Sequence, residues 1–372
     1  MRPLSSTTSS VEQTSTSSSS PSDGFFAAEG ETFESIGVKS PVLLERIRNG
    51  LNLDRPSAVQ AATFMAVSDG GDVTVGAETG SGKTLAYLLP LLDDILQRKQ
   101  TSGSVGYDFC RAIILVPNKE LVNQVVRMAT VLCGGPQCLV SSTTPLNSRD
   151  KPNEDYGGND DANDGSSTDE KDLVRLAVMP GGLDAPESFR PFRNSIALGG
   201  TEAPVDLVIS TPAAVAPLGV KPKNIDMFAD IETLVIDEAD MLLDGGYIRP
   251  LQDVMLGFRR ADRLDASYQV PKTQHVFVAA TLPDMGLRSV DSFLQKRFPH
   301  ATRVTMAGMH NAKHYGLREQ TVWIEEEENR DRMLRLVELL KTPADEGGLE
   351  GVKTIVFLNS VDDVDGAHGA LE

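Results

Sequence analysis

The most informative part of this sequence is Ala77-Glu78-Thr79-Gly80-Ser81-Gly82-Lys83-Thr84. It follows a short apolar strand pattern, Val73–Val75, and it precedes a helical pattern that begins at Leu85. Its two glycines allow backbone conformations that other residues avoid, so the N–H groups of the turn can converge on a phosphate chain. The N-terminus of the following helix adds a partial positive charge. The stretch therefore predicts a phosphate-binding loop, in which Lys83 holds the β- and γ-phosphates and Thr84 holds Mg²⁺.

A second motif, Asp237-Glu238-Ala239-Asp240, follows the β pattern Thr233–Ile236. We expect it to place two carboxylates beside the metal that Thr84 binds, with Asp237 as a further metal ligand. One such motif could arise by chance, whereas the pair in this order indicates a nucleotide-hydrolysing site.

Composition narrows the class of protein. The chain has 372 residues, enough for two domains or for one large domain with extensions. It contains no run of eighteen apolar residues, so we expect no membrane span. Its three cysteines do not form a disulfide framework and favour a reducing compartment, and its five histidines lack zinc-ligand spacing. The net charge of −18 is unusual for a nucleic-acid binder, although part of it is confined to residues 147–172, which hold nine acids and three bases.

Residues 1–30 read as a disordered leader rich in Ser and Thr. The leader has no apolar segment, so we predict an intracellular protein that is not secreted. A plain disordered tail and an organelle transit peptide, for a plastid or a mitochondrion, both stay open.

Apolar runs alternating with helical patterns predict an α/β domain of three layers with a parallel sheet over residues 31–306. The strand patterns are 73–75, 112–116, 207–210, 233–236 and 276–280, and helices are expected at Pro41–Ile47 and from Pro56 onward. The acidic stretch 147–172 is expected to be a disordered insertion.

A linker over 307–320 and an incomplete second α/β unit over 321–372 are expected to follow. The unit is predicted from strand patterns at 321–324 and 354–358 and from a helix at Arg332–Leu340. About fifty residues are too few for a domain of this class, so we expect this sequence to be a fragment.

The order of these motifs resembles that of the DEAD-box RNA helicases over roughly residues 33–360. The resemblance implies a RecA-like P-loop domain followed by the start of a second RecA-like domain, with ATP and Mg²⁺ as cofactors and RNA as the partner. Phe33 and Pro56–Gln60 resemble the family's adenine-binding motif. They imply that Gln60 hydrogen-bonds the adenine edge and that Phe33 stacks on the ring.

Two further loops resemble the family's RNA-binding motifs. Pro117–Gln124 is similar to motif Ia and Ser210–Ala214 to motif Ib, which implies RNA contacts at Pro117, Lys119, Thr211 and Pro212. The sequence departs from the family at Asn118-Lys119, where Thr-Arg is usual, and at Ala213-Ala214, where Gly-Arg is usual. Both changes remove an arginine from the expected RNA contacts.

Coupling between ATP and RNA is expected at Asp240, Ala279 and Thr281. Ala279-Ala280-Thr281 lies where the family has Ser-Ala-Thr, so one hydroxyl is missing. Ile355–Ser360 resembles motif IV of the second domain. The family's motifs V and VI, with their arginines, would lie beyond Glu372.

The resemblance implies an ATP-dependent RNA helicase that binds and locally unwinds or remodels RNA. Its catalytic residues are Lys83, Asp237 and Glu238, with Glu238 orienting and deprotonating the attacking water. Arginine fingers contribute on the order of 10³–10⁵ in rate, so we expect this chain alone to be nearly inactive.

Three alternatives remain at this point. The protein could be a nucleotide-dependent RNA clamp or ribonucleoprotein remodeller without unwinding, because Ala214 and Ala279 depart from the family. It could be a P-loop ATPase that does not act on RNA. It could also be a non-catalytic interaction protein, against which the intact Lys83, Thr84, Asp237 and Glu238 argue.

Overall fold

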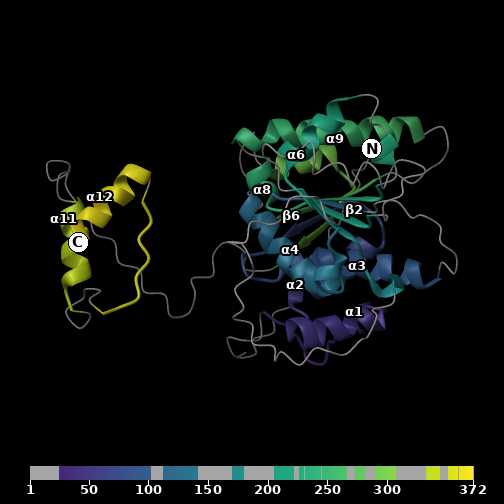
Figure 1. Cartoon of the computed structure of the whole chain (residues 1–372), viewed down its shortest axis with the longest axis horizontal. Helices are drawn as coiled ribbons and strands as arrows, with labels where there is room; N and C mark the ends of the chain where they lie inside the picture. Colours follow the sequence, from purple (N-terminus) through teal and green to yellow (C-terminus); the bar gives the residue numbers. More distant parts are fainter. Residues whose placement is uncertain are drawn as a thin grey trace, which may run out of the picture. The chain divides into compact units, whose positions relative to one another are not determined.

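The computed structural model describes residues 25–101, 112–140, 170–179, 205–221, 226–229, 231–243, 245–265, 273–280, 290–306, 332–343, 351–358 and 360–371 (Figure 1). The chain divides into two compact units, Met1–Ala312 and Lys313–Glu372. Within the described ranges, no helix combines the length and the apolar character that crossing a membrane requires.

The first unit is built on a parallel sheet. Its described strands pair in the order β3-β4-β2-β5-β6-β1-β7, and every pair is parallel. The register aligns Val75 of β1 with Val278 of β6, and Ile114 of β2 with Val235 of β5. The strands are β1 (Val73–Gly76), β2 (Ala112–Leu115), β3 (Leu176–Met179), β4 (Leu207–Ser210), β5 (Thr233–Ile236), β6 (Gln274–Ala279) and β7 (Thr302–Thr305).

Helices cover both faces of this sheet (Figure 1). One face carries α1 (Pro41–Glu45), which continues as a π-helix over Arg46–Gly50, α2 (Ala58–Ser68), α3 (Lys83–Thr101) and α4 (Lys119–Cys133). The other face carries α6 (Pro212–Val220), α8 (Ala239–Leu242) and α9 (Ile248–Asp265). The hydrophobic core on this second side also includes residues of α7 (Asp226–Ala229) and α10 (Val290–Arg297). The described residues of this unit also form short 3₁₀-helices at Pro136–Cys138, Glu170–Asp172 and Gly245–Tyr247.

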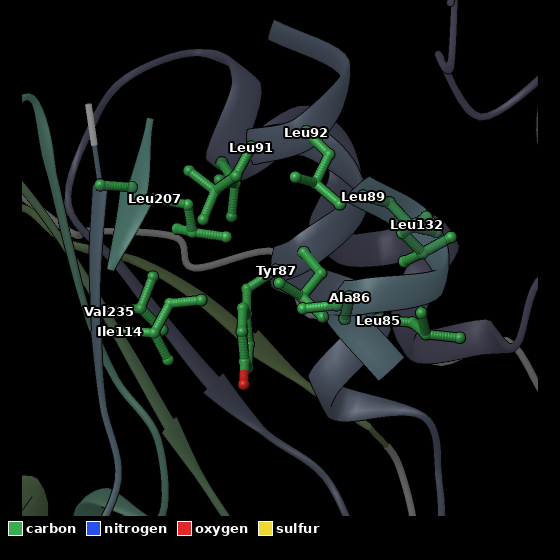
Figure 2. Close-up of a cluster of buried hydrophobic side chains, with 14 of the residues drawn as sticks. Leu85, Ala86, Tyr87, Leu89, Leu91, Leu92, Ile114, Leu132, Leu207 and Val235 are labelled. Atoms are coloured by element: carbon green, nitrogen blue, oxygen red, sulfur yellow. The ribbon is translucent and has the colours of Figure 1, made fainter. Parts of the chain in front are cut away.

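Two hydrophobic cores lie on opposite sides of the sheet because successive strand residues point to opposite faces. Ile114 and Val235 pack beneath α3 with Tyr87 and leucines such as Leu92 (Figure 2). Their strand neighbours Ile113, Leu115 and Leu234 belong to the second core, with residues of α6 and α9. The predicted α/β domain of three layers with a parallel sheet is confirmed.

Side-chain caps fix where the helices near the sheet edge begin. The hydroxyl of Ser57 and the amide of Gln60 form a capping box at the start of α2. The side chain of Asn118 accepts a hydrogen bond from the Leu121 N–H and so starts α4, which ends at Gly134 with a left-handed φ of 115°.

The structure corrects two predicted boundaries. The segment that begins at Phe25 pairs with the start of α2, since the Ala58 N–H donates to the Phe25 carbonyl and the Ala27 N–H donates to the Pro56 carbonyl. The folded part therefore begins before residue 31, because backbone pairing holds these residues. Similarly, Glu170–Asp172 forms a 3₁₀-helix whose Asp172 carbonyl accepts from Arg46 at 2.7 Å. The insertion predicted over residues 147–172 therefore extends too far at its C-terminal end, by the residues of this helix. Residues 147–169 lie outside the described residues.

The second unit contains α11 (Arg332–Lys341) and α12 (Val361–Leu371). The helix expected at Arg332–Leu340 is confirmed, and the strand pattern at 321–324 lies outside the described residues. The strand expected at Thr354–Leu358 is wrong, because residues 353–358 carry no strand assignment. Ile355 and Phe357 are 80% and 89% exposed, so no described strand or helix covers this apolar segment or supplies the hydrogen bonds that a strand needs.

Candidate nucleotide-binding and hydrolysis site

The sheet brings the two decisive motifs to one edge. Strands β1 and β5 end immediately before Ala77 and Asp237, and β6 lies between them in the sheet. The Ala77 N–H donates to the Ala279 carbonyl at 3.2 Å, and the Asp237 N–H donates to the Leu115 carbonyl at 2.9 Å. In parallel α/β sheets, ligands bind outside the carboxyl ends of the strands, so this edge is the candidate site.

The loop Ala77–Thr84 has the conformation that its glycines predict. Gly80 and Gly82 have φ values of +84° and +94°, a region that L side chains rarely adopt. A Cβ atom on Gly82 would lie 2.4 Å from Nε2 of Gln60, so this position also requires the absence of a side chain. Of the remaining loop residues, Glu78 is exposed, while Ser81 is half-buried and its Oγ is buried without a hydrogen-bond partner. An orphaned hydroxyl in such a loop fits a bound phosphate.

Lys83 closes the loop. Its ammonium donates to the carbonyls of Ala77 and Glu78 at 2.9 and 3.0 Å, and the residue is only 7% exposed. Both acceptors are neutral carbonyl oxygens of the loop itself. Phosphate oxygens would form stronger, charge-assisted bonds, so Lys83 can exchange the carbonyls for them.

Gln60 joins α2 to the loop. Its Oε1 accepts from the Ser57 N–H at 2.9 Å, and its Nε2 donates to the Gly82 carbonyl at 3.3 Å. An amide retains a second N–H and a second lone pair, which remain for a base. Phe33 is 2% exposed and belongs to the core on the α2–α3 side, so its expected stacking on adenine stays a prediction.

Asp237 is held at both carboxylate oxygens. Oδ1 accepts from the Glu238 N–H at 2.9 Å, and Oδ2 accepts from the Tyr87 hydroxyl at 2.7 Å. Burial raises the pKa of Asp237, against the opposing effects of these two hydrogen bonds and of the Lys83 charge. The Tyr87 contact is absent from the sequence-based expectations. The only sequence signal is its position four residues after Lys83, on the same face of the helix.

Glu238 lies half-buried beside Asp237. Burial and then the negative charge of Asp237 raise the pKa of its carboxyl. Its backbone has a left-handed conformation with φ 49° and ψ 48°, which is uncommon for a residue other than glycine. Backbone strain of this kind concentrates at functional sites.

The donor set fits Mg²⁺ bound together with a nucleotide. Thr84 and Asp237 offer hard oxygen ligands at the same sheet edge, and Mg²⁺ usually takes one or two carboxylates plus phosphate oxygens and waters. No group of three or more His, Cys, Asp or Glu residues that could hold a metal exists in the part of the chain described. A metal site made by protein alone is therefore not indicated there.

The predicted RNA loops lie side by side at the same edge. Strands β2 and β4 are neighbours, with Leu115 aligned to Ser210 and the Val116 N–H donating to the Ser210 carbonyl at 3.0 Å. The residues that follow these strands include Lys119, which is exposed, and Pro117, Thr211 and Pro212, which are buried. Ala214, where an arginine was expected from the family, is 2% exposed and packs in the core.

The predicted coupling residues are only partly described. Ala279 ends β6 opposite Gly76 and is 1% exposed. Asp240 accepts at Oδ1 from the Met241 N–H at 3.0 Å. Thr281 lies outside the described residues. Ala279 contacts the loop directly, because its carbonyl accepts a hydrogen bond from the Ala77 N–H.

Comparison with known proteins agrees with this geometry. Residues 57–159 match the family described as DEAD/DEAH box helicase. The rice protein "DEAD-box ATP-dependent RNA helicase 22" is 27% identical over 91% of this chain and 63% of its own length. The protein "ATP-dependent RNA helicase dbp9" of Botryotinia fuckeliana is 30% identical over 61% of this chain and 29% of its own length. The chain thus spans less than two thirds of either relative.

A solved structure shows the same fold. "Structure of Mss116p (NTE and C-tail double deletion) bound to ssRNA and AMP-PNP" aligns with a TM-score of 0.50 and 18% identity, over 75% of this chain and 45% of that one. The fold and the loop at its sheet edge define a RecA-like P-loop domain. The match over residues 57–159, together with the relatives above, shows that the chain carries a DEAD/DEAH box helicase domain.

Proposed function

We propose that this chain is the nucleotide-binding part of an ATP-dependent RNA helicase that binds RNA and locally unwinds or remodels it. The observation that supports this proposal most is the convergence of Lys83, Asp237 and Glu238 at the edge where β1 and β5 end. The catalytic domain is taken as residues 31–306, preceded by the ordered segment that starts at Phe25, with a linker over 307–320. The names of its relatives agree with the proposal, since both are called ATP-dependent RNA helicases.

ATP is the proposed nucleotide, and its phosphates are bound by Ala77–Thr84. On binding, the Lys83 ammonium leaves the carbonyls of Ala77 and Glu78 for phosphate oxygens, and the loop N–H groups turn toward the same oxygens. Gln60 supports selection of adenine, because its Nε2 already donates to the loop carbonyl of Gly82 and an amide retains a second N–H and a second lone pair for a base. Phe33 is proposed to stack on the adenine ring.

Hydrolysis is proposed to depend on the buried carboxylate of Asp237 and the half-buried carboxylate of Glu238. Thr84 and Asp237 would hold Mg²⁺, which when bound neutralises charge on the phosphates. Glu238 would orient the attacking water and accept its proton, a role that its raised pKa favours because a stronger base takes the proton more readily. Asp240, Ala279 and Thr281 are proposed to relay the nucleotide state across the sheet edge.

RNA is the proposed partner at the neighbouring loops. The loops after β2 and β4 carry Pro117, Lys119, Thr211 and Pro212, adjacent to β5 and its carboxylates. Of these residues only Lys119 is an exposed cation, so we expect modest RNA affinity for this domain alone. The solved structure of Mss116p carries single-stranded RNA and AMP-PNP according to its title.

The test measures nucleotide binding first and turnover second. A fluorescent ADP analogue should bind the chain with Mg²⁺, and Lys83→Ala should abolish binding. ATP hydrolysis should be slow in the chain alone. It should be stimulated by single-stranded RNA when the chain is joined to a complete second RecA-like domain, and Glu238→Gln should abolish it. Turnover that ignores RNA would discard the RNA assignment and favour a P-loop ATPase with another partner.

A second candidate is an RNA clamp or ribonucleoprotein remodeller that does not unwind. It is favoured by Ala279, whose side chain is a buried methyl group where a serine hydroxyl was expected from the family. The carbonyl of Ala279 accepts a hydrogen bond from the Ala77 N–H of the phosphate loop. Ala279→Ser should raise unwinding at unchanged ATP turnover if the missing hydroxyl uncouples the two. No change in unwinding would argue against an uncoupled protein.

A further inference from the structure

The hydroxyl of Tyr87 lies in an unusual place for a core residue. Tyr87 lies on α3 and is 0% exposed, and it belongs to the core on the side of α3 that faces Ile114 and Val235 (Figure 2). A phenylalanine would fill this space equally well, and a buried hydroxyl without a partner costs free energy. The hydroxyl therefore needs a specific acceptor.

That acceptor is Oδ2 of Asp237, at 2.7 Å. Burial and the negative charge of Asp237 raise the pKa of Tyr87 well above its ordinary value, so the phenol stays protonated and donates. The Glu238 N–H holds the other oxygen of the same carboxylate at 2.9 Å. Two donors from different parts of the chain thus fix the rotation of the Asp237 side chain.

Tyr87 also belongs to the phosphate-binding element. It lies four residues after Lys83 and three after Thr84, so the three side chains share one side of the first turns of α3. The second predicted metal ligand, Thr84, is close enough that its side chain partly offsets the rise in the pKa of Tyr87. Helix α3 therefore carries the proposed phosphate-binding residue Lys83 and the proposed metal ligand Thr84. It also carries Tyr87, which donates a hydrogen bond to the other proposed metal ligand, Asp237.

We propose that Tyr87 is a positioning residue that holds the Asp237 carboxylate in its metal-binding orientation relative to the phosphate loop. This inference rests on the proposed function, because it assigns a metal to Asp237. Each oxygen of Asp237 keeps a free lone pair after accepting one hydrogen bond, so the contact leaves the carboxylate able to bind Mg²⁺. Partners that orient a metal ligand in this way typically change metal affinity about 10–100-fold when they are removed.

The decisive variant is Tyr87→Phe, which keeps the ring and removes only the hydroxyl. Binding of a fluorescent ADP analogue is titrated with Mg²⁺ and is also measured in EDTA. We expect affinity in EDTA to stay within about twofold, whereas the Mg²⁺ concentration that gives half of the metal-dependent enhancement rises about tenfold. Tyr247→Phe is the matched control, because Tyr247 is 36% exposed and lies on the separate 3₁₀-helix Gly245–Tyr247.

Two outcomes would overturn the inference. One is an unchanged Mg²⁺ midpoint in Tyr87→Phe, and the other is an equal loss of affinity with and without Mg²⁺, which a purely structural role would produce. If Tyr87→Phe is less stable, the rise in melting temperature on adding Mg²⁺ and ADP, taken relative to each variant without ligand, gives the same comparison.

Failure of the proposed function would look different. In that case the unmodified chain would bind no nucleotide, or Lys83→Ala would bind as well as the unmodified chain, and both proposals would fall. Normal dependence on Lys83 together with an unchanged Mg²⁺ midpoint in Tyr87→Phe would remove only the inference about Tyr87.

Discussion

Glu238 combines a left-handed backbone, a half-buried carboxyl and a charged neighbour. Its pKa is raised in the folded chain, so its ionised form is less favourable there than in the unfolded chain. Neutralising this residue should therefore stabilise the fold while it removes activity. Such a trade between stability and function is expected if Glu238 has the proposed catalytic role.

We predict that Glu238→Gln raises the melting temperature by roughly 2 °C near pH 7.5. The gain should be present above the raised pKa of Glu238 and should vanish as the pH falls below it, because the unmodified carboxyl is then also neutral. Thermal melts across this range measure the effect, with the exposed Glu29→Gln as control. A gain that does not depend on pH would contradict the prediction.

The two loop glycines allow a second prediction at the scale of the residue. Gly80 and Gly82 have similar left-handed backbones, but only a Cβ on Gly82 meets a neighbour, Nε2 of Gln60 at 2.4 Å. Gly80→Ala should cost about 1–2 kcal/mol of unfolding free energy from backbone strain alone. Gly82→Ala should cost more and should also displace the Gln60 amide.

Urea unfolding of both variants, together with the preference for ATP over GTP, checks this expectation. Gly82→Ala should lose base preference, whereas Gly80→Ala should keep it if nucleotide still binds. Equal losses of stability and of base preference in the two variants would mean that the contact with Gln60 has no role.

At the scale of the element, α3 is anchored at both ends. Its first residue closes the phosphate loop, and near its last turn Lys99 forms an ion pair with Asp206, which is 2% exposed and lies just before β4. Burial raises the pKa of Asp206, and Lys99 opposes this rise. The pair thus fixes the far end of the helix that carries Lys83, Thr84 and Tyr87.

We predict that Lys99→Met lowers the unfolding free energy by about 3 kcal/mol, because it leaves a buried carboxylate without its cation. Adding Asp206→Asn should recover much of the loss. The neighbouring Arg98→Met is the control, because its ion pairs with Asp94 and Glu232 are nearly half exposed and should contribute less than about 1 kcal/mol. Denaturant melts that give equal losses for Lys99→Met and Arg98→Met would refute this account.

Elements also differ in how far their own sequence determines them. The helix from Lys83 and the helix from Arg332 form as their patterns predict. The apolar run Thr354–Leu358 has the composition of a strand but does not form one within the described residues. A helix satisfies its hydrogen bonds locally, whereas a strand depends on a neighbouring strand.

At the scale of the whole molecule, the net charge of −18 opposes RNA binding. Residues 147–169 hold seven acids and two bases, so replacing them with a Gly/Ser segment of equal length changes the net charge from −18 to −13. We predict that this replacement strengthens binding of single-stranded RNA several-fold at low salt and has little effect at about 0.5 M salt, where the charges are screened. Fluorescence anisotropy at both salt concentrations is the measurement.

The Gly/Ser replacement keeps the length of the segment, so it separates charge from chain length. Two results would show that the acidic segment does not act through its charge. One is an increase in RNA affinity that persists at high salt, and the other is an unchanged RNA affinity at low salt.

The parallel sheet, the glycine-containing loop and the position of the two carboxylates could be predicted from the sequence. Gly80 and Gly82 predict the loop because its backbone takes conformations that glycine favours, and Lys83 follows them directly in the sequence. Buried parallel strands appear in the sequence as uninterrupted apolar runs such as Ala112–Leu115. The expectation that Asp237 and the loop lie at the same edge of the sheet could be reached from the sequence because the carboxyl ends of parallel strands share one edge.

The contacts between residues far apart in the chain could be found only in the folded structure. The hydrogen bond from Tyr87 to Asp237 joins positions 150 residues apart, and the bond from Gln60 to the Gly82 carbonyl spans 22. The left-handed backbone of Glu238 and the pairing of Phe25 with the start of α2 likewise have no local sequence signal. Such features depend on which elements pack together, because the energy that holds each of them comes from a partner in another element.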